Sequence, residues 1–181
     1  MKKHYYLVSQ LPDISNAAEK STLPITQKYY MDLCSRFMEG KELTALKQLS
    51  LEPPREIVST GSSFLDAWYN NERQLRYALV QIRAQKMKKD TGSIPVTING
   101  DIVQAARTAC GMDSPLSAEQ FLLEYRLGVL DSLKPMDSFS TDAVFAYGIR
   151  LMLISRNKLF DKEKGTTSYH KIYDSILGDT L

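Results

Sequence analysis

The chain has few of the residues that build most metal and catalytic centres. Its 181 residues include only two histidines and two cysteines. Neither His4 nor His170 has a neighbour at metal-ligand spacing. Cys34 and Cys110 are far apart and belong to no CxxC pair, which argues against a disulfide framework or a structural zinc site. We therefore expect no metal and no cofactor, and two buried, reduced thiols in a reducing compartment.

The motifs of several enzyme classes are also missing. The sequence contains no GxxxxGK[ST] pattern that could form a phosphate-binding loop, and no GxGxxG after a candidate strand. Gly61-Ser62-Ser63 lacks the strand–turn–helix context and the histidine partner of a nucleophilic serine. We expect no catalytic residues and no enzymatic activity. The alternative is an enzyme whose residues converge only in three dimensions.

Long hydrophobic runs and a strong charge imbalance are absent as well. No apolar run approaches the roughly 20 residues that a membrane-spanning helix needs. The basic start of the chain resembles a signal peptide, but Gln10 and Pro12 interrupt it before an adequate apolar stretch has formed. A net charge of +2 does not favour nucleic acid or an anionic membrane as the partner. We expect a cytoplasmic protein without direct membrane insertion. The sequence leaves self-association open.

Helical patterns account for most of the chain. Residues 4–11 could form a short extended segment that ends at Pro12, but the remaining periodic segments are bounded by helix caps and breakers. We predict an all-α, irregular bundle in one domain, 1–181. The alternative is two lobes, 1–92 and 99–181, because turn-forming residues cluster in 90–100. About seven helices are expected, at 26–38, 41–49, 64–89, 101–110, 117–133, 142–160 and 168–177.

The longest predicted helix, 64–89, carries charges within its apolar stripe. On a helical wheel, Trp68 and Tyr69 lie among other large apolar residues and are the expected packing anchors. Glu72, Arg76 and Arg83 fall within the same arc. An unpaired buried charge costs several kcal/mol, but Glu72 and Arg76 are spaced i, i+4 and could pair. Three interpretations stay open: side chains that reach the edge of the stripe, an internal ion pair, or contact with a partner.

The end of this helix is strongly basic. Residues 73–89 contain six basic residues and no acidic one, which could contact phosphate. The stretch has no interleaved exposed aromatics and no groove-reading motif, and cations favour a helix C-terminus. A solvated helix end is therefore preferred, and nucleic acid is disfavoured as a partner. The six residues are Arg73, Arg76, Arg83, Lys86, Lys88 and Lys89.

The predicted helix 142–160 is apolar on all sides over 143–154, where only Gly148 and Arg150 interrupt the apolar residues, as in a helix at the centre of a bundle. Tyr147 is its expected packing anchor, and Gly148 would permit close approach of a neighbouring segment. Arg150 and Arg156 lie at the rims of the apolar region. Their candidate partners on the preceding helix are Glu119, Glu124 and Asp131.

Four segments together resemble a known family. The opening YYLVSQLP is similar to the YYLVASLP-type start of short bacterial proteins that are encoded in V-type (A/V-type) ATPase operons and related to the C (d) subunit. The family's aromatic pair and E..LR..L...RA pattern are matched by 68–84. Its AY..RL-like helix resembles 146–151, and its charged loop with a glycine resembles 161–165. At Tyr77 the family usually has asparagine, so a polar contact expected there is in doubt.

The resemblance implies a C-subunit-like role without bond-making chemistry. That subunit is a helical socket that sits on the rotor ring and receives the foot of the central shaft. This chain has about half its usual length and would supply part of such a socket, peripheral to the inner membrane. A stiff body with ion pairs among Glu72, Arg76 and Arg83 would suit torque transmission. The alternatives are an assembly or regulatory factor of the same complex, or a helical adaptor or nucleic-acid-binding module that uses residues 73–89.

Overall fold

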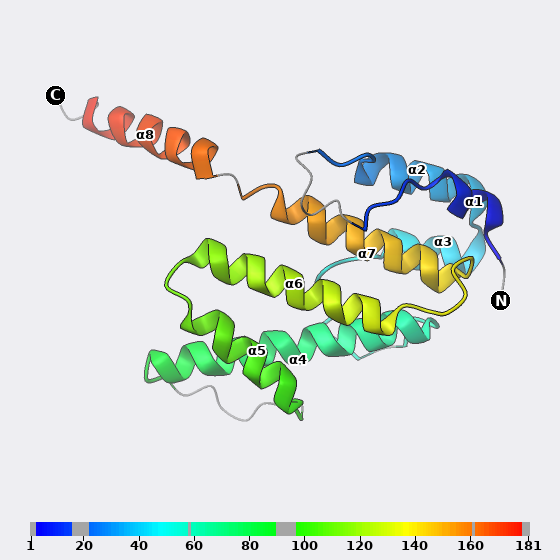
Figure 1. Ribbon diagram of the computed structural model, residues 1–181, viewed down its shortest axis with the longest axis horizontal. Helices are drawn as coiled ribbons and strands as arrows, with labels where there is room; N and C mark the ends of the chain where they lie inside the picture. The colour runs from blue at the N-terminus through cyan, green and yellow to red at the C-terminus, as the bar shows by residue number, and fades with distance from the viewer. Residues whose placement is uncertain (1–2, 16–21, 58, 90–96, 161, 179–181) are drawn as a thin grey trace.

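The computed structural model describes residues 3–15, 22–57, 59–89, 97–160 and 162–178, and these contain eight α-helices and no strand (Figure 1). The prediction of an all-α helical bundle is confirmed. The helices are Tyr5–Gln10 (α1), Gln27–Phe37 (α2), Gly40–Lys47 (α3), Ser63–Lys86 (α4), Gly100–Gly111 (α5), Pro115–Leu133 (α6), Thr141–Asn157 (α7) and Lys162–Gly178 (α8).

The first helix replaces the extended segment considered for 4–11. In α1, Leu7 is fully buried, whereas Tyr5 and Tyr6 are exposed. A strand would have placed Tyr5 and Leu7 on the same face, because side chains alternate along it. The helix buries Leu7 while leaving Tyr5 outside. Among the residues that the structure describes, extended pairing is confined to an isolated bridge between Lys3 and Ser140.

Side-chain caps begin most of the longer helices. Thr26, Ser62 and Ser140 each accept a hydrogen bond from a backbone N–H in the first turn, as their positions predicted. The helix predicted to begin at Ser117 begins at Pro115. Ser114 caps α6 instead, and Pro115 occupies the first helical position, where its fixed φ angle suits the helix and its missing N–H costs nothing.

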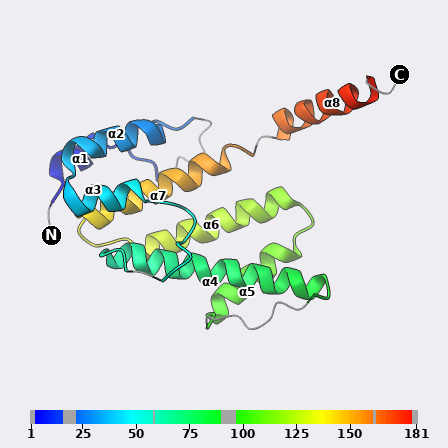
Figure 2. The same cartoon turned by 180° about the vertical axis from the view of Figure 1, so that it is seen from behind.

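The body is built around α7, which packs against α2, α4 and α6 (Figures 1 and 2). Ile149 and Leu151 are completely buried, in agreement with the prediction that this helix is central. Gly148 is needed for the close approach. A Cβ atom there would lie 2.7 Å from both the Tyr30 hydroxyl and a methyl group of Leu49. The absence of a side chain thus lets two segments reach the α7 backbone.

Two buried clusters share the body. The larger contains apolar residues of α1–α3, the first part of α4, α6 and α7. The smaller joins the second part of α4 to α5 and Leu122 of α6. Both clusters therefore include α4 and α6, and the chain crosses between them more than once. The predicted boundary at 90–100 falls largely on residues 90–96, which lie outside the described residues, and the division into lobes stays a prediction.

The last helix is longer than expected. A charged turn was predicted at 161–166, but α8 already begins at Lys162 and passes through Gly165. One glycine costs a helix interior only about 1 kcal/mol, and no proline is present to stop it. Figures 1 and 2 show α8 extending away from the other helices. None of its described residues belongs to either buried cluster.

The two cysteines differ in burial. Cys34 is fully buried in α2 as expected, whereas Cys110 is only half-buried. Burial raises the pKa of the Cys34 thiol from its ordinary value of 9.0 to about 11, and a hydrogen bond with Tyr30 opposes part of this shift. The folded protein therefore holds the thiol proton more tightly than the unfolded chain does.

This pKa difference predicts a loss of stability in alkali. Its contribution is fully present below pH 9.0, where both states are protonated, and is lost as the pH rises to about 11. Urea unfolding across this window should show a declining free energy of unfolding. Cys34→Ala should decline less steeply over the same window, although its stability at neutral pH is lower. A decline parallel to that of the unaltered protein would exclude the thiol as a contributor.

Candidate interaction site

A buried ion-pair cluster joins α4 to α6. The Glu72 side chain on α4 is almost completely buried and receives two hydrogen bonds from Arg126 on α6, Nε to Oε2 at 2.9 Å and Nη2 to Oε1 at 3.0 Å. Arg76 adds a third bond, Nε to Oε1 at 2.9 Å. Charge-assisted pairs of this bidentate kind are strong and directional. The cluster therefore sets the register between the two helices.

Arg76 reaches from this cluster to the surface. Its side chain is 39% exposed, and it also lies 3.7 Å from Glu52 and donates to the Leu51 carbonyl at 3.4 Å. Arg76 thus agrees with two of the interpretations that the sequence left open. It forms an internal ion pair, and its side chain reaches the edge of the stripe. Its contact with the 51–52 segment connects the cluster to the loop before α4.

Arg83 does not belong to the cluster. It is exposed, and no ion pair of Arg83 occurs within the described part of the chain. Its exposure agrees with the interpretation that its side chain reaches the edge of the stripe, since the neighbouring Ala84 is buried. Met87 at the end of the helix is also exposed. An interface role for Arg83 stays a prediction.

Arg126 was missed at the sequence level. It lies in α6 between Leu122, Leu123 and Leu130, all of which are buried. Four residues at helical spacing on one face, one of them an arginine, are the signal that could have revealed it. Sequence spacing indicates i, i+4 partners within one helix, so it pairs Glu72 with Arg76 and gives no sign of a partner on another helix.

The basic stretch 73–89 is partly engaged in internal contacts. Arg73 is buried and donates to the Pro54 carbonyl at 2.8 Å, Arg76 pairs with Glu72, and Lys86 donates to the Cys110 carbonyl. Three of the six cations are thus directed toward the protein itself. This leaves less positive charge for a phosphate ligand than the sequence pattern indicated.

The two arginines of α7 pair with α6 as their positions suggested. Arg150 binds Asp131 directly, and Arg156 lies 3.4 Å from Glu119. Arg156 also stands over the Phe160 ring, 5.9 Å from its centroid. These pairs lie near opposite ends of the α6–α7 contact. They are partly solvated, so each is expected to contribute little stability.

The three predicted anchors are placed differently. Trp68 is buried in the larger cluster, and its indole N–H has no hydrogen-bond partner within the described residues. The Tyr69 hydroxyl accepts a hydrogen bond from the Ser50 N–H at 3.3 Å. The Tyr147 hydroxyl donates to the Pro12 carbonyl at 2.9 Å, and burial raises the pKa of Tyr147. Tyr69 and Tyr147 thus attach loops to the helical body.

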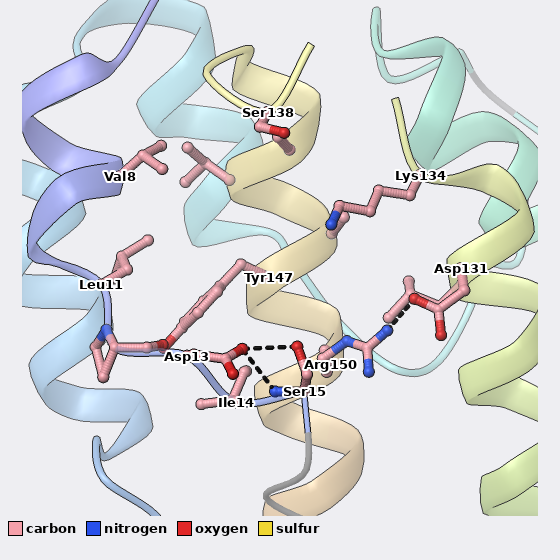
Figure 3. A pocket seen from close by; sticks show the side chains of 15 residues that line it. Val8, Leu11, Asp13, Ile14, Ser15, Asp131, Lys134, Ser138, Tyr147 and Arg150 are labelled. Carbon is pink, nitrogen blue, oxygen red and sulfur yellow. Dashed lines mark hydrogen bonds and ion pairs between the residues drawn. The ribbon is translucent and has the colours of Figure 1, made fainter. Parts of the chain in front are cut away.

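A cleft of about 280 Å³ lies beside Tyr147, between α1, the turn at 12–15, α6 and α7 (Figure 3). Val8 and Leu11 line one side, while Lys134 and Arg150 line the other. It combines apolar and cationic walls. No residue of this cleft other than Tyr147 and Arg150 was among the predicted site residues.

A second surface feature lies on α8. Five large apolar side chains are 49–62% exposed and occupy positions i, i+3, i+4, i+7 and i+8 of one helical face. Tyr169 and Tyr173 stack on each other, with ring centroids 5.9 Å apart. An apolar stripe of this kind marks a surface for protein contact more often than an ordinary solvated helix. Its members are Tyr169, Ile172, Tyr173, Ile176 and Leu177.

Comparison with protein-family models, curated proteins and solved structures yields no match. Within the described ranges, His, Cys, Asp and Glu side chains form no group of three that could hold a metal ion. In the same ranges, each helix is either too short or insufficiently apolar to cross a membrane. The candidate interaction sites are therefore the α8 stripe, the ion-pair cluster and the cleft.

Proposed function

We propose that the chain is a non-catalytic, C-subunit-like component of a V-type ATPase, which docks through α8 onto another subunit of the central stalk. The observation that carries docking is the exposed apolar stripe of α8. The choice of this complex rests on the similarity of YYLVSQLP and of the 68–84 and 146–151 patterns to the operon-encoded family. Such a component works in the cytoplasm, peripheral to the inner membrane.

The α8 stripe has the spacing of a helix that binds in a groove. Anchors at i, i+3, i+4 and i+7 lie along one face and insert together into an apolar channel. Beyond the stripe, the described face of α8 is polar, with Lys171 and Asp174 exposed to solvent. The helix is therefore suited to lie on a partner with one side while the other faces water.

The occupant that fits this stripe is a groove between two helices of a partner. Tyr169 and Tyr173 have broad rings, which stack on each other. A symmetric pair of α8 helices would have to place four such rings in one seam, whereas two-helix seams favour Ile, Val and Leu. A groove of two helices can admit tyrosines while leaving their hydroxyls at its wet rim. The central shaft, whose foot the resembled subunit receives, is the proposed partner.

The body of the protein supports a mechanical role. The bidentate pair between Arg126 and Glu72 holds α6 against α4, and the close packing at Gly148 holds α7 against Tyr30 of α2 and against Leu49. A coupling component must pass a load without changing shape, and packed interiors resist compression. Docking through a projecting helix and stiffness in the body are complementary requirements for such a component.

The experiment is affinity capture of the tagged chain from cells in gentle detergent, with ATPase subunits quantified in the eluate. We expect wild type to recover them and Ile172→Glu/Ile176→Glu to lose at least about tenfold, because two charges would be buried in the groove. The matched control, Ser168→Glu/Ser175→Glu, adds the same charge on the polar face and should recover as much as wild type. Thermal unfolding should be alike in all three.

Two results would reject the proposal: wild type that recovers no ATPase subunit, or a stripe variant that recovers as much as the control. Recovery confined to incompletely assembled complexes would replace a permanent subunit by an assembly factor. Self-association would be revealed by a doubled mass in light scattering, which the stripe variant abolishes.

A further inference from the structure

A second cleft lies between α4 and the loop that precedes it. Its volume is about 330 Å³, within the roughly 300–1,000 Å³ range of small-ligand sites. Pro54, Ile57 and Tyr69 form its apolar walls. Ile57 is 79% exposed, so most of its side chain is available to a ligand. We call this site the Arg73 cleft, after the buried cation that lines it.

Arg73 has hydrogen-bond donors that the protein does not use. Only 8% of the residue is exposed, and it forms no ion pair within the described part of the chain. One of its five N–H groups donates to the Pro54 carbonyl, from Nη2 at 2.8 Å. The Nε and Nη1 donors have no partner among the described residues, yet they are not sealed from solvent, since Trp68 alone has a sealed polar group without a partner there. Because Arg73 lines the cleft, a ligand in it can reach these donors.

Two further polar side chains of α4 line the cleft. Asn70 precedes Arg73 by three residues, so both project from the same side of the helix. The Asn70 carboxamide can both donate and accept, and it forms no hydrogen bond within the described residues. Asp66 is already engaged, because it accepts from the Ser59 hydroxyl at 2.7 Å and from the Thr60 N–H at 2.8 Å. The cleft thus has one charge of each sign, and a ligand without net charge is favoured over a carboxylate or a phosphate.

We infer that the Arg73 cleft binds the main chain of an extended peptide segment that carries an apolar side chain. Each peptide unit offers one carbonyl acceptor and one N–H donor. The carbonyl accepts from Arg73, as the Pro54 carbonyl already does, and the same unit forms hydrogen bonds with the Asn70 carboxamide. The apolar side chain packs against Ile57 and Tyr69. The segment is extended because a helix uses its peptide groups internally.

The loop that forms one wall of the cleft is attached to α4 at both ends. Near the start of the loop, the Tyr69 hydroxyl accepts a hydrogen bond from the Ser50 N–H at 3.3 Å. Near its end, the Thr60 hydroxyl donates to Asp66 at 2.8 Å. The hydrogen-bonded Pro54 carbonyl fixes the loop between these points. A site formed in advance loses less conformational entropy when it binds. The cleft is separate from the α8 stripe and does not depend on the proposed docking role.

The test is an NMR titration of the full chain with the blocked dipeptide acetyl-leucyl-leucinamide at millimolar concentration. Two comparison probes each lack one feature of the ligand. Acetyl-glycyl-glycinamide has the peptide units without the apolar side chains, and 4-methylpentanoate has an apolar chain with a carboxylate in place of a peptide unit. The leucine peptide should cause saturable shifts at residues of the cleft and bind at least about tenfold more tightly than either comparison probe.

Variants separate the polar and apolar contributions. Asn70→Ala removes the carboxamide and should weaken the leucine peptide about threefold to tenfold. Arg73→Met removes the unused donors and should weaken it at least about tenfold, with an unchanged helical circular dichroism spectrum as evidence of folding. Ile57→Ser should weaken the leucine peptide while leaving the glycine peptide unchanged. The matched control Gln85→Ala alters an exposed amide of α4 outside the cleft and should leave all affinities unchanged.

Four results would overturn the inference. The first is binding of 4-methylpentanoate as tight as that of the leucine peptide, which would indicate a carboxylate site. The second is unchanged peptide binding in both Asn70→Ala and the folded Arg73→Met. The third is a set of shifts confined to 169–177. The fourth is the absence of saturable shifts in the folded wild type.

Discussion

Arg126→Met is expected to lower the free energy of unfolding by about 3–5 kcal/mol. Glu72 is almost fully buried, and Arg126 supplies two of the three hydrogen bonds that Glu72 accepts from arginines. Methionine fills much of the same space but leaves the carboxylate with Arg76 alone, whose side chain is partly solvated. Urea unfolding at neutral pH, followed by circular dichroism, gives the measurement.

The matched control is Arg83→Met. Arg83 is an exposed arginine of α4, so its replacement should change the free energy of unfolding by no more than about 0.5 kcal/mol. The double variant Glu72→Met/Arg126→Met should recover most of the loss, because no buried charge is then left without its partner. Equal stability of Arg126→Met and Arg83→Met would show that the buried pair does not hold α4 against α6.

Gly148→Ala is expected to destabilise the protein by about 1–3 kcal/mol. The added Cβ would lie 2.7 Å from the Tyr30 hydroxyl oxygen and 3.0 Å from a carbon of its ring. The ring cannot retreat easily, because the hydroxyl donates to the Val144 carbonyl at 2.8 Å. Leu49 offers a more flexible contact and can adjust. The gain in helix propensity, about 1 kcal/mol, offsets only part of the strain.

Gly128→Ala provides the comparison. Gly128 lies inside α6, is exposed, and has no atom within 4 Å of the position that a Cβ would take. The same substitution should therefore stabilise the protein by about 0.5–1 kcal/mol through helix propensity alone. Opposite signs of the two effects in urea unfolding are expected. Stabilisation by both alanines would mean that α7 does not approach Tyr30 as closely as described.

The sequence was sufficient for the helical class and for most helix ends, because caps such as Ser62 and breakers such as Pro135 act within a few residues. It also predicted the pairs that Arg150 and Arg156 form with the preceding helix. At the start of α6, the helix was predicted to begin at Ser117, but the cap is Ser114, which directly precedes Pro115. Local chemistry is the reason that these predictions succeeded.

Long-range relations were less accessible. The pairing of Glu72 with Arg126 spans 54 positions and depends on the crossing of α4 and α6, which no periodicity within one helix reveals. The cleft likewise requires α1 and α6 to meet across α7. Residues 4–11 are short enough that burial of Leu7 alone decided between helix and strand. In each case the deciding interaction was tertiary.

The projection of α8 away from the other helices has a consequence for the affinity with which this helix binds a partner. A helix of 17 residues, whose described residues lie outside both buried clusters, is not far above the length at which isolated helices become marginal in water. Part of its order would then be acquired at the moment of contact, and that conformational entropy would be subtracted from the affinity. Substitutions on the polar side that strengthen the isolated helix would tighten the complex without adding a contact. The affinity for a partner and the stability of the body could thus be altered separately, by changes in different parts of the chain.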